Sequence, residues 1–313
     1  MKNFVLVILL GVLLCVLGCK KGSAPGPSSN AGQNIVSAKE IIAPNVAGQF
    51  YPLAPDSLKA MIENFFSQTP EIKFPDNMLG FMSPHAGYEY SGPVAAYIFK
   101  NLPLGRFKRV VILFPSHWQS FRGILALDQD AYRTPLGDVP IDRESVKKLI
   151  LADPAIFWKP DLYMKEHAGE VMLPFLQERL GDTFKIIPLM MGDQSPGMAR
   201  NLAEVLNQVF GADRDVLYIA SSDMSHYHDY GTANALDAVA LNQIMHLDPD
   251  ALVGDMGSHR AELCGYGPVL TLMQLSRMRG AESAKILKHL NSGDTAGDKS
   301  RVVGYGAVEF FSK

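Results

Sequence analysis

The sequence predicts a single-domain α/β fold with a mostly parallel or mixed central sheet and helices on both of its faces. Two observations carry this prediction. Short apolar segments of strand type alternate along the chain with longer segments of helical type. No low-complexity stretch and no internal repeat divides the chain after about residue 41. With 313 residues, of which 47 % are hydrophobic and 19 % are charged, the chain can bury a sizeable core without disulfides.

The expected elements follow from the apolar pattern in chain order. A short apolar strand at 78–83 is followed by a helix at 92–102. Strands and helices go on to alternate up to the strand that ends at residue 223, a group of helices comes next, and two strands close the chain. The remaining expected elements are strands at 109–116, 184–191, 215–223, 284–290 and 301–311, and helices at 143–151, 169–180, 197–210, 232–246, 248–256 and 264–279.

The first residues have the pattern of an export signal. Lys2 precedes an apolar run from Phe4 to Leu17, which is short for a membrane span of about 20 residues. The letters VLGC at 16–19 resemble a bacterial lipobox, in which cleavage leaves Cys19 as a lipidated N-terminus. We therefore expect a lipoprotein signal peptide at 1–18, then the lipidated Cys19 and a flexible tether to residue 40. An uncleaved anchor or an ordinary secretory signal is the alternative.

The expected location follows from the same segment. Lys20, rather than an aspartate, follows Cys19, so the sequence carries no signal for retention in an inner membrane. We expect an exported protein that is lipid-anchored to a bacterial membrane, at the outer membrane or cell surface. The net charge of −3 and the absence of a basic run argue against a nucleic-acid partner.

Three cysteines are present, and only one remains for the folded domain. Cleavage would remove Cys15, and lipidation would consume Cys19. Cys264 is then left without an intramolecular partner. An unpaired thiol in an exported protein is exposed to oxidation unless it is buried or bound to a metal.

Polar side chains gather where the expected strands end. In open α/β sheets, ligands bind beyond the carboxyl ends of the strands. Imidazole, carboxylate and thiolate groups are also the ligands that transition metals prefer. Two helix openings, EHAGE and LCGYG, add further candidates of these types. The candidate site residues are His85, His117, Glu166, His167, Glu170, Asp223, His226 and Cys264.

Each candidate also has an explanation without a ligand. Asp223 could cap a helix, and Glu166 and Glu170 could favour a helix N-terminus through the macrodipole. Cys264 could be a small buried hydrophobic residue, and a single histidine at a strand end is often only a hydrogen-bonding loop residue. Four further histidines have no polar companions or no assignable role in the sequence: His228, His246, His259 and His289.

Eight motifs, in order from about residue 43 to the end, together resemble one family. They are PNVAGQFYP, SPHAGYEYSGPVAA, PSHW, YRTPLGDVPID, EHAGEVMLPFLQ, SSDMSHY, LCGYGPV and GDKSRVVGYGAVEF. The chain is similar to the Memo family, also described in bacteria as AmmeMemoRadiSam system protein B. The resemblance implies that residues 41–313 form a Memo-like domain similar to class III extradiol dioxygenases. It also implies partners of the radical SAM and AMMECR types.

The resemblance further implies a bound transition metal, iron or copper, with zinc as a third option. The metal ligands would be His85, His117 and Cys264. Ring-cleaving dioxygenases hold Fe(II) with two histidines and a carboxylate, whereas this chain has a thiol at the third position. A thiolate is a softer ligand than a carboxylate. The similarity in fold therefore does not imply that this chain cleaves aromatic rings.

The same comparison gives catalytic expectations. His226 matches the acid/base position of the dioxygenases, and Asp223 would orient it. Glu166 and His167 match an EH pair that also faces the pocket. If the protein is an enzyme, an iron-dependent oxidoreductase or a copper redox protein is expected. The alternatives are a non-enzymatic protein that buffers metal or binds a peptide or small ligand in this pocket, and a degenerate scaffold whose polar pocket is satisfied by hydrogen bonds.

Overall fold

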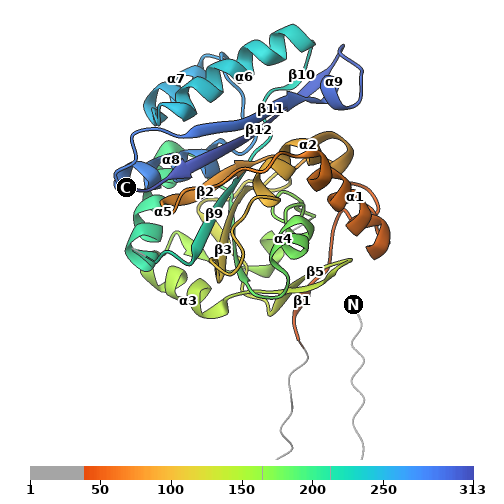
Figure 1. Cartoon of the computed structure of the whole chain (residues 1–313). Coiled ribbons are helices and arrows are strands. Elements are labelled where there is room, and N and C mark those ends of the chain that lie inside the picture. The colour runs from red at the N-terminus through yellow and green to blue at the C-terminus, as the bar shows by residue number, and fades with distance from the viewer. Residues whose placement is uncertain (1–38, 164, 212) are drawn as a thin grey trace, which may run out of the picture. The chain divides into compact units, whose positions relative to one another are not determined.

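The computed structural model describes residues 39–163, 165–211 and 213–313. The expected signal peptide, Cys19 and all but the end of the tether lie outside the described residues. Lys39–Lys313 forms one compact unit, built on a nine-stranded sheet with helices on both faces (Figure 1). This arrangement confirms the predicted α/β fold class. In the part of the chain that the structure describes, none of the helices has the length and apolar character to cross a membrane.

The centre of the large sheet is parallel. Its four strands pair side by side and run in one direction, so their carboxyl ends meet at one edge of the sheet. In spatial order they are β2 (Met78–Ser83), β9 (Val216–Ser221), β3 (Arg109–Pro115) and β8 (Lys185–Met191).

Antiparallel strands complete the sheet on both sides. β12 (Val302–Phe311) pairs with β2, and both β11 (Lys285–Asn291) and β10 (His226–His228) pair with β12. On the other side, β4 (Ile124–Ala126) pairs antiparallel with β8 and parallel with β7 (Ile156–Phe157). The sheet is therefore mixed, as expected.

A second, small sheet lies near the start of the described chain. It contains β1 (Ile41–Ile42), β5 (Ala131–Thr134) and β6 (Gly137–Pro140). β1 pairs parallel with β5, which pairs antiparallel with β6. The first described residues are thereby fixed to the folded unit.

Helices cover the large sheet from both sides (Figure 1). One group packs together as α1 (Pro55–Gln68), α2 (Tyr88–Phe99) and α4 (Leu173–Leu180). A second group contains α3 (Arg143–Ala152), α5 (Pro196–Phe210) and α8 (Tyr266–Met278). The remaining helices are α6 (Tyr230–Met245), α7 (Pro249–Gly257), α9 (Ser292–Thr295) and the 3-10 turn Pro160–Leu162.

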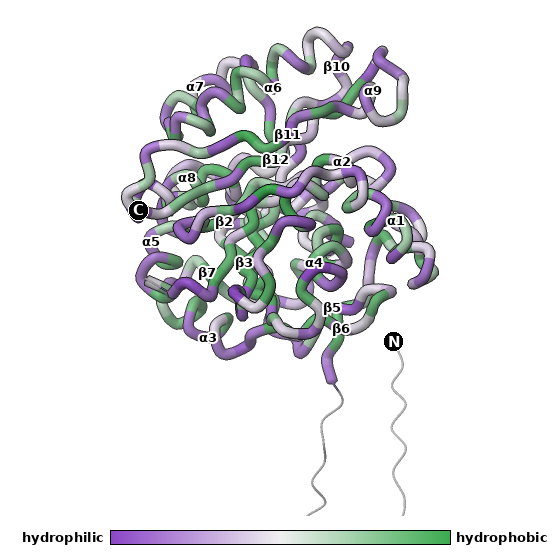
Figure 2. The backbone as a smooth tube through the Cα atoms, viewed as in Figure 1, coloured by the Kyte–Doolittle hydropathy of each residue, from purple (hydrophilic) through white to green (hydrophobic). Residues whose placement is uncertain are grey.

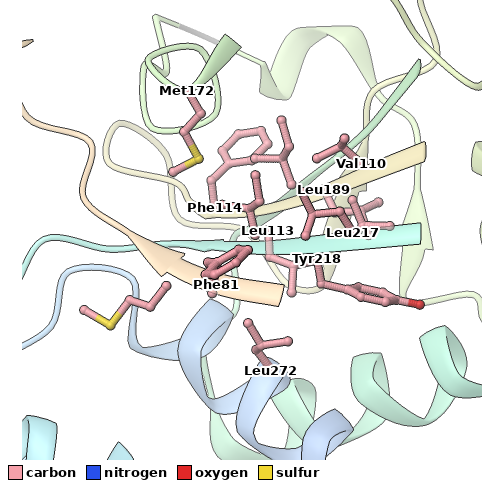
Figure 3. Packing of buried hydrophobic residues seen from close by; sticks show 14 of the residues in the cluster. Phe81, Val110, Leu113, Phe114, Met172, Leu189, Leu217, Tyr218 and Leu272 are labelled. Atoms are coloured by element: carbon pink, nitrogen blue, oxygen red, sulfur yellow. The ribbon is translucent and has the colours of Figure 1, made fainter. Parts of the chain in front are cut away.

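The core lies on both faces of the central strands. Figure 3 shows Met172, next to α4, and Leu272, on α8, on opposite sides of strands that carry Phe81, Leu113 and Leu217. All of these side chains are buried. Strands covered on both faces need apolar residues at successive positions, which explains the nearly continuous apolar runs in this part of the chain (Figure 2).

Two expected helices begin at other residues. The helix expected at 92–102 begins at Tyr88, because Gly92 and Pro93 lie inside α2 and not at its start. The helix expected at 169–180 begins only at Leu173, because the residues before it form a turn in which the backbone N–H of Glu170 donates to the carbonyl of His167.

Several elements were not predicted. The helix α1 has proline at its first position, which is typical of a helix start. Only two of its residues are fully buried, however, so the apolar face by which a helix is recognised in a sequence is narrow. The other unpredicted elements have two to four residues, which is too short for a periodic pattern to appear. They are β1, β4, β5, β6, β7, β10, α9 and the 3-10 turn.

Candidate metal centre

Loops at the carboxyl edge of the parallel strands bring three candidate ligands together. His85 follows β2, His117 follows β3, and Cys264 lies just before α8. Each offers one ligand atom, and these atoms all lie within 4.8 Å of one another. The imidazole rings of His85 and His117 have their centroids 5.1 Å apart. Residues 32 and 147 positions apart in the sequence therefore form one cluster, as a shared ion requires.

A glycine lets Cys264 approach the strands. Gly265 lies against the end of β9, and a Cβ atom at this position would be 2.0 Å from the carbonyl oxygen of Ser221. A larger residue would push the loop outward, and the thiol with it. The glycine in the LCGYG motif is therefore needed for close approach of two backbones.

A hydrogen-bond chain fixes the proton of His85. The Ser221 hydroxyl donates to the carbonyl of Ala168 at 2.6 Å, so it must accept from Nδ1 of His85 at 2.7 Å. This leaves the Nε2 lone pair of His85 free, 3.2 Å from Sγ of Cys264. Burial lowers the pKa of His85 to about 3, so the ring is neutral and suited to bind a metal.

Glu166 holds His117 in the same way. Its carboxylate accepts from Nδ1 of His117 at 3.0 Å and from the His117 backbone N–H at 2.7 Å. Nε2 is then the nitrogen of His117 that remains for a ligand, and the side chain is 29 % exposed. A carboxylate behind a histidine is a common arrangement for histidines that bind metal, because it sets the ring orientation and raises the basicity of the free nitrogen.

Glu166 is better suited to orienting His117 than to binding an ion. A second group of donor atoms, from His117, Glu166 and His167, also lies within 4.8 Å. However, Glu166 already accepts the backbone N–H groups of His167 and Ala168, both at 2.8 Å. Burial would raise the pKa of Glu166, but the hydrogen bonds and charge of His117, together with the N–H of Ala168, lower it to about 2. Four N–H donors therefore occupy the carboxylate that a metal would need.

The thiol of Cys264 is protonated without a metal. Its Sγ accepts the backbone N–H of Asp223 at 3.2 Å and faces Nε2 of His85. Burial raises the pKa of the thiol well above its usual range, and the nearby Asp223 raises it further. The thiol can therefore donate its proton to His85, and a metal would have to displace that proton.

Asp223 holds the loop of His85, and in the part of the chain that the structure describes its carboxylate makes no hydrogen bond to the ring of His226, which it was expected to orient. Its Oδ1 accepts the backbone N–H of His85 at 2.8 Å, and burial raises the pKa of the carboxyl group. The ring of His226 is held instead by the carbonyl of Met224, which accepts from Nδ1 at 2.7 Å. With Nδ1 as the donor to this carbonyl, Nε2 is the ring nitrogen of His226 that can accept a proton.

His226 lies in the same pocket lining as Cys264, and His167 lies beside His117. A pocket of about 260 Å³ opens beside Cys264 and is lined by His226 and Glu262. The ring of His167 stacks on that of His117, with centroids 5.0 Å apart. Burial lowers the pKa of His167 to about 4, and His85 adds to this effect, so His167 is neutral.

Glu170 serves the fold and not the cluster. Its buried carboxylate accepts the backbone N–H groups of Asn45 and Val46, at 2.6 and 3.1 Å, and the hydroxyl groups of Tyr51 and Tyr132. Burial raises its pKa in spite of these bonds. Glu170 thus ties the start of the domain to the segment before α4.

Several supporting residues were missed by the sequence reasoning. Ser221 lies in the SSD motif, which the sequence analysis had singled out. Its role could not be predicted, because it depends on a hydrogen bond to Ala168, which is distant in the sequence. Asp237 is buried in α6, where it accepts the backbone N–H of Ser225 at 2.9 Å and bonds to Nε2 of His289 at 2.8 Å. His289 therefore has a polar companion, contrary to the sequence-based interpretation. His228 has one too, since its Nε2 lies 2.9 Å from Glu262.

Comparisons with known proteins agree with the sequence motifs. A family model described as Memo-like protein matches residues 43–309. A MEMO1 family protein of Ignicoccus hospitalis is 38 % identical over 277 residues, which cover 85 % of this chain and 97 % of that protein. MEMO1 family proteins of Saccharolobus islandicus and Saccharolobus solfataricus are 39 % and 38 % identical over 282 residues, which cover 86 % of this chain and 99 % of each relative.

Among solved structures, that of an uncharacterized protein from Escherichia coli K12 aligns with a TM-score of 0.44 and 13 % identity, over 74 % of this chain and 99 % of that one. The family match and the relatives each span most of the folded unit. The chain belongs to the Memo-like protein family.

Proposed function

We propose that this protein binds one transition-metal ion through His85, His117 and Cys264. The observation that carries the proposal is the convergence of three donor atoms within 4.8 Å, on residues from three separate loops. Hydrogen bonds support it, because Ser221 and Glu166 occupy the Nδ1 atoms and leave both Nε2 atoms for a ligand.

The donor set favours particular metals. Two imidazoles and one thiolate suit copper, zinc or iron, and they disfavour magnesium and calcium, which prefer oxygen ligands. We propose iron or copper as the native metal, and either ion would supply one-electron redox chemistry when bound. The thiolate favours Cu(I), which is softer than Fe(II).

Metal content tests this proposal directly. The parent protein should retain about one equivalent of iron or copper after purification under anaerobic conditions, and His85→Ala and Cys264→Ser should retain much less. His246→Ala is a matched control, because His246 is an exposed histidine at the C-cap of α6 whose ring Nδ1 bonds to the backbone carbonyl of Asn242. Equal metal content in the parent and both ligand variants would refute the assignment.

A redox enzyme is the second proposal, favoured by the pocket beside Cys264. A small molecule in that pocket would meet His226, whose free Nε2 can take a proton from it. His226→Gln should then keep the metal but suppress oxygen uptake with an active substrate. Metal loss equal to that of His85→Ala would make His226 a ligand instead. A parent protein that holds metal and shows no turnover with a broad substrate panel would favour metal buffering.

We also propose that a lipid on Cys19 anchors the protein to a bacterial membrane, at the outer membrane or cell surface. The support is the VLGC pattern and the polar tether behind it. Cys19→Ser should leave the precursor uncleaved or release the protein from membranes. A variant that still fractionates as a mature, lipid-modified species would refute this proposal.

A further inference from the structure

Gln194 connects the loop between β8 and α5 to the segment that carries Cys264. Its side-chain Nε2 donates to the carbonyl of Cys264 at 3.0 Å. Its Oε1 accepts the backbone N–H of Gly267, also at 3.0 Å. A carbonyl can only accept and an N–H can only donate, so this amide orientation is the one that satisfies both partners. One side chain thus holds both ends of the Cys264–Gly267 segment.

The contact also caps helix α8. Gly265, at the N-cap position, has no side chain to accept the backbone N–H groups of the first turn. Gln194 supplies that acceptor from another part of the chain, at the second residue of the helix. A Cβ atom on Gly267 would lie 2.9 Å from Cα of Gln194, so the glycine allows the two segments to touch.

The backbone of Gln194 is itself well held. The N–H of Ser195 donates to Oδ1 of Asp193 at 2.9 Å, and the Ser195 hydroxyl caps α5. The N–H of Asp193 donates to the carbonyl of Gly123 at 3.2 Å. Gln194 therefore extends from a loop that is fixed by hydrogen bonds. Its side-chain amide can in turn restrict the backbone of Cys264.

The opposite side of the Cys264 segment is held by the end of β9. The backbone N–H of Cys264 donates to the carbonyl of Asp223 at 3.3 Å, and that of Gly265 donates to the Ser222 hydroxyl at 3.0 Å. On the side of β8, the Gln194 amide bonds to the carbonyl of Cys264. Without this bond, the Cys264 backbone would be held by Asp223 and Ser222 alone, and its thiol could move away from His85.

We propose that Gln194 is a positioning residue that sets how tightly the site binds a soft metal, an inference that rests on the proposed metal function. It touches neither the thiol nor either histidine ring in the contacts described, and it acts through the backbone of Cys264. Partners that orient metal ligands typically change metal affinity by about 10- to 100-fold when removed.

Two substitutions separate this role from helix capping. Gln194→Met keeps the length of the side chain and removes both hydrogen bonds. Gln194→Glu keeps an acceptor for the N–H of Gly267, where a negative charge is also favourable at a helix N-terminus. It loses the donor to Cys264 and sets a carboxylate oxygen against that carbonyl. Gln68→Met, on the exposed surface of α1, is the matched control.

The measurement uses Cu(I) affinity, from anaerobic competition, and the thiolate-to-metal absorption band of the Co(II)-loaded protein. Both Gln194 variants should bind Cu(I) about 10- to 100-fold more weakly than the parent, and the Co(II) band should shift or weaken at saturation. Gln194→Glu should lose less thermal stability than Gln194→Met, because it keeps the acceptor for Gly267, and both affinities are measured well below the melting temperatures so that weaker binding cannot be assigned to unfolding. Gln68→Met should match the parent throughout.

The inference fails if both variants bind Cu(I) like the parent and give the same Co(II) band, because Gln194 would then only cap the helix. A Gln194→Glu variant that binds normally while Gln194→Met binds weakly would also overturn it, since the bond to Cys264 would be irrelevant. A parent protein that binds neither ion would overturn the proposed metal function itself. The parent and variant measurements therefore distinguish the two failures.

Discussion

Glu309 is a buried carboxyl group in the large sheet, between strands β11 and β2. It lies in β12 with 1 % of its surface exposed, opposite Phe81 of β2 and Lys285 of β11. Its Oε1 is buried and has no hydrogen-bond partner among the described residues. Burial raises the pKa of this carboxyl group from 4.5 to about 7, and Lys285 opposes only part of that effect.

The raised pKa predicts a loss of stability at higher pH. Below the unfolded pKa, Glu309 is protonated in both states and its contribution to stability is fully present. As the pH rises from 4.5 to about 7, the unfolded chain loses this proton while the folded protein keeps it, so the free energy of unfolding falls. At about 1.4 kcal/mol for each pH unit, the loss amounts to about 3 kcal/mol.

Glu309→Gln should remove this dependence, because the amide does not titrate in this range. Urea unfolding of parent and variant at about pH 5 and about pH 8 measures it. The difference between their free energies of unfolding should move by about 2 to 3 kcal/mol in favour of the variant between these values. Glu282→Gln, at an exposed position, should show no such change. Parallel pH profiles of the parent and Glu309→Gln would show that the fold does not disfavour this carboxylate.

Three further predictions concern the site and its supports. Glu166→Gln should weaken metal binding by about 10- to 100-fold in a competition titration, because the charge that orients His117 is lost, and unchanged affinity would contradict this role. Gly304→Ala should cost about 1–3 kcal/mol in urea unfolding, because a Cβ atom there would lie 1.9 Å from Oδ2 of Asp237; wild-type stability would mean that the carboxylate can move aside. Adding metal at about 100 times its dissociation constant should raise the free energy of unfolding by about 2.7 kcal/mol in the parent but not in Cys264→Ser, and an equal rise in both would exclude the thiol.

The central strands could be predicted from the sequence because their environment is uniform. β3 and β9 are buried on both faces, so their positions are apolar except Arg109 at the start of β3 and Ser221 at the end of β9, and the boundaries are clear within two residues. The short strands away from the centre of the sheet depend on pairing with distant segments. β4, for example, is fixed by its register with Met191 and Met190 of β8, which no local pattern reveals.

The ligand positions could be predicted for a related reason. Parallel strands end at one edge of the sheet, so residues that follow β2 and β3 must lie near each other. Cys264 precedes a helix and was connected to the cluster only by the family resemblance. The partners that orient the ligands were not predictable, because Ser221 and Glu166 act through contacts between residues 49 to 136 positions apart.

Protons on the ligands oppose metal binding, and the structure indicates where they lie. Burial lowers the pKa of His85 to about 3, so this ring carries no extra proton near neutral pH. Burial would also lower the pKa of His117, but the hydrogen bond to Glu166 and the negative charges of Glu166 and Asp223 together outweigh it and raise that pKa above its usual value. Burial raises the pKa of Cys264, so the thiol is protonated before a metal binds. Two protons, on Cys264 and His117, can therefore compete with the ion.

The pH dependence of metal affinity should separate these two protons. Above the pKa of His117, only the thiol must lose a proton, so the logarithm of the affinity should rise by about one for each pH unit. Below that pKa, His117 must also lose a proton, and the slope should approach about two. His85 adds nothing to either slope, because it is already neutral across this range. A competition titration from about pH 5 to about pH 8 measures both slopes. A slope near zero at neutral pH would exclude the Cys264 thiolate as a ligand, and a slope of one at every pH would exclude His117.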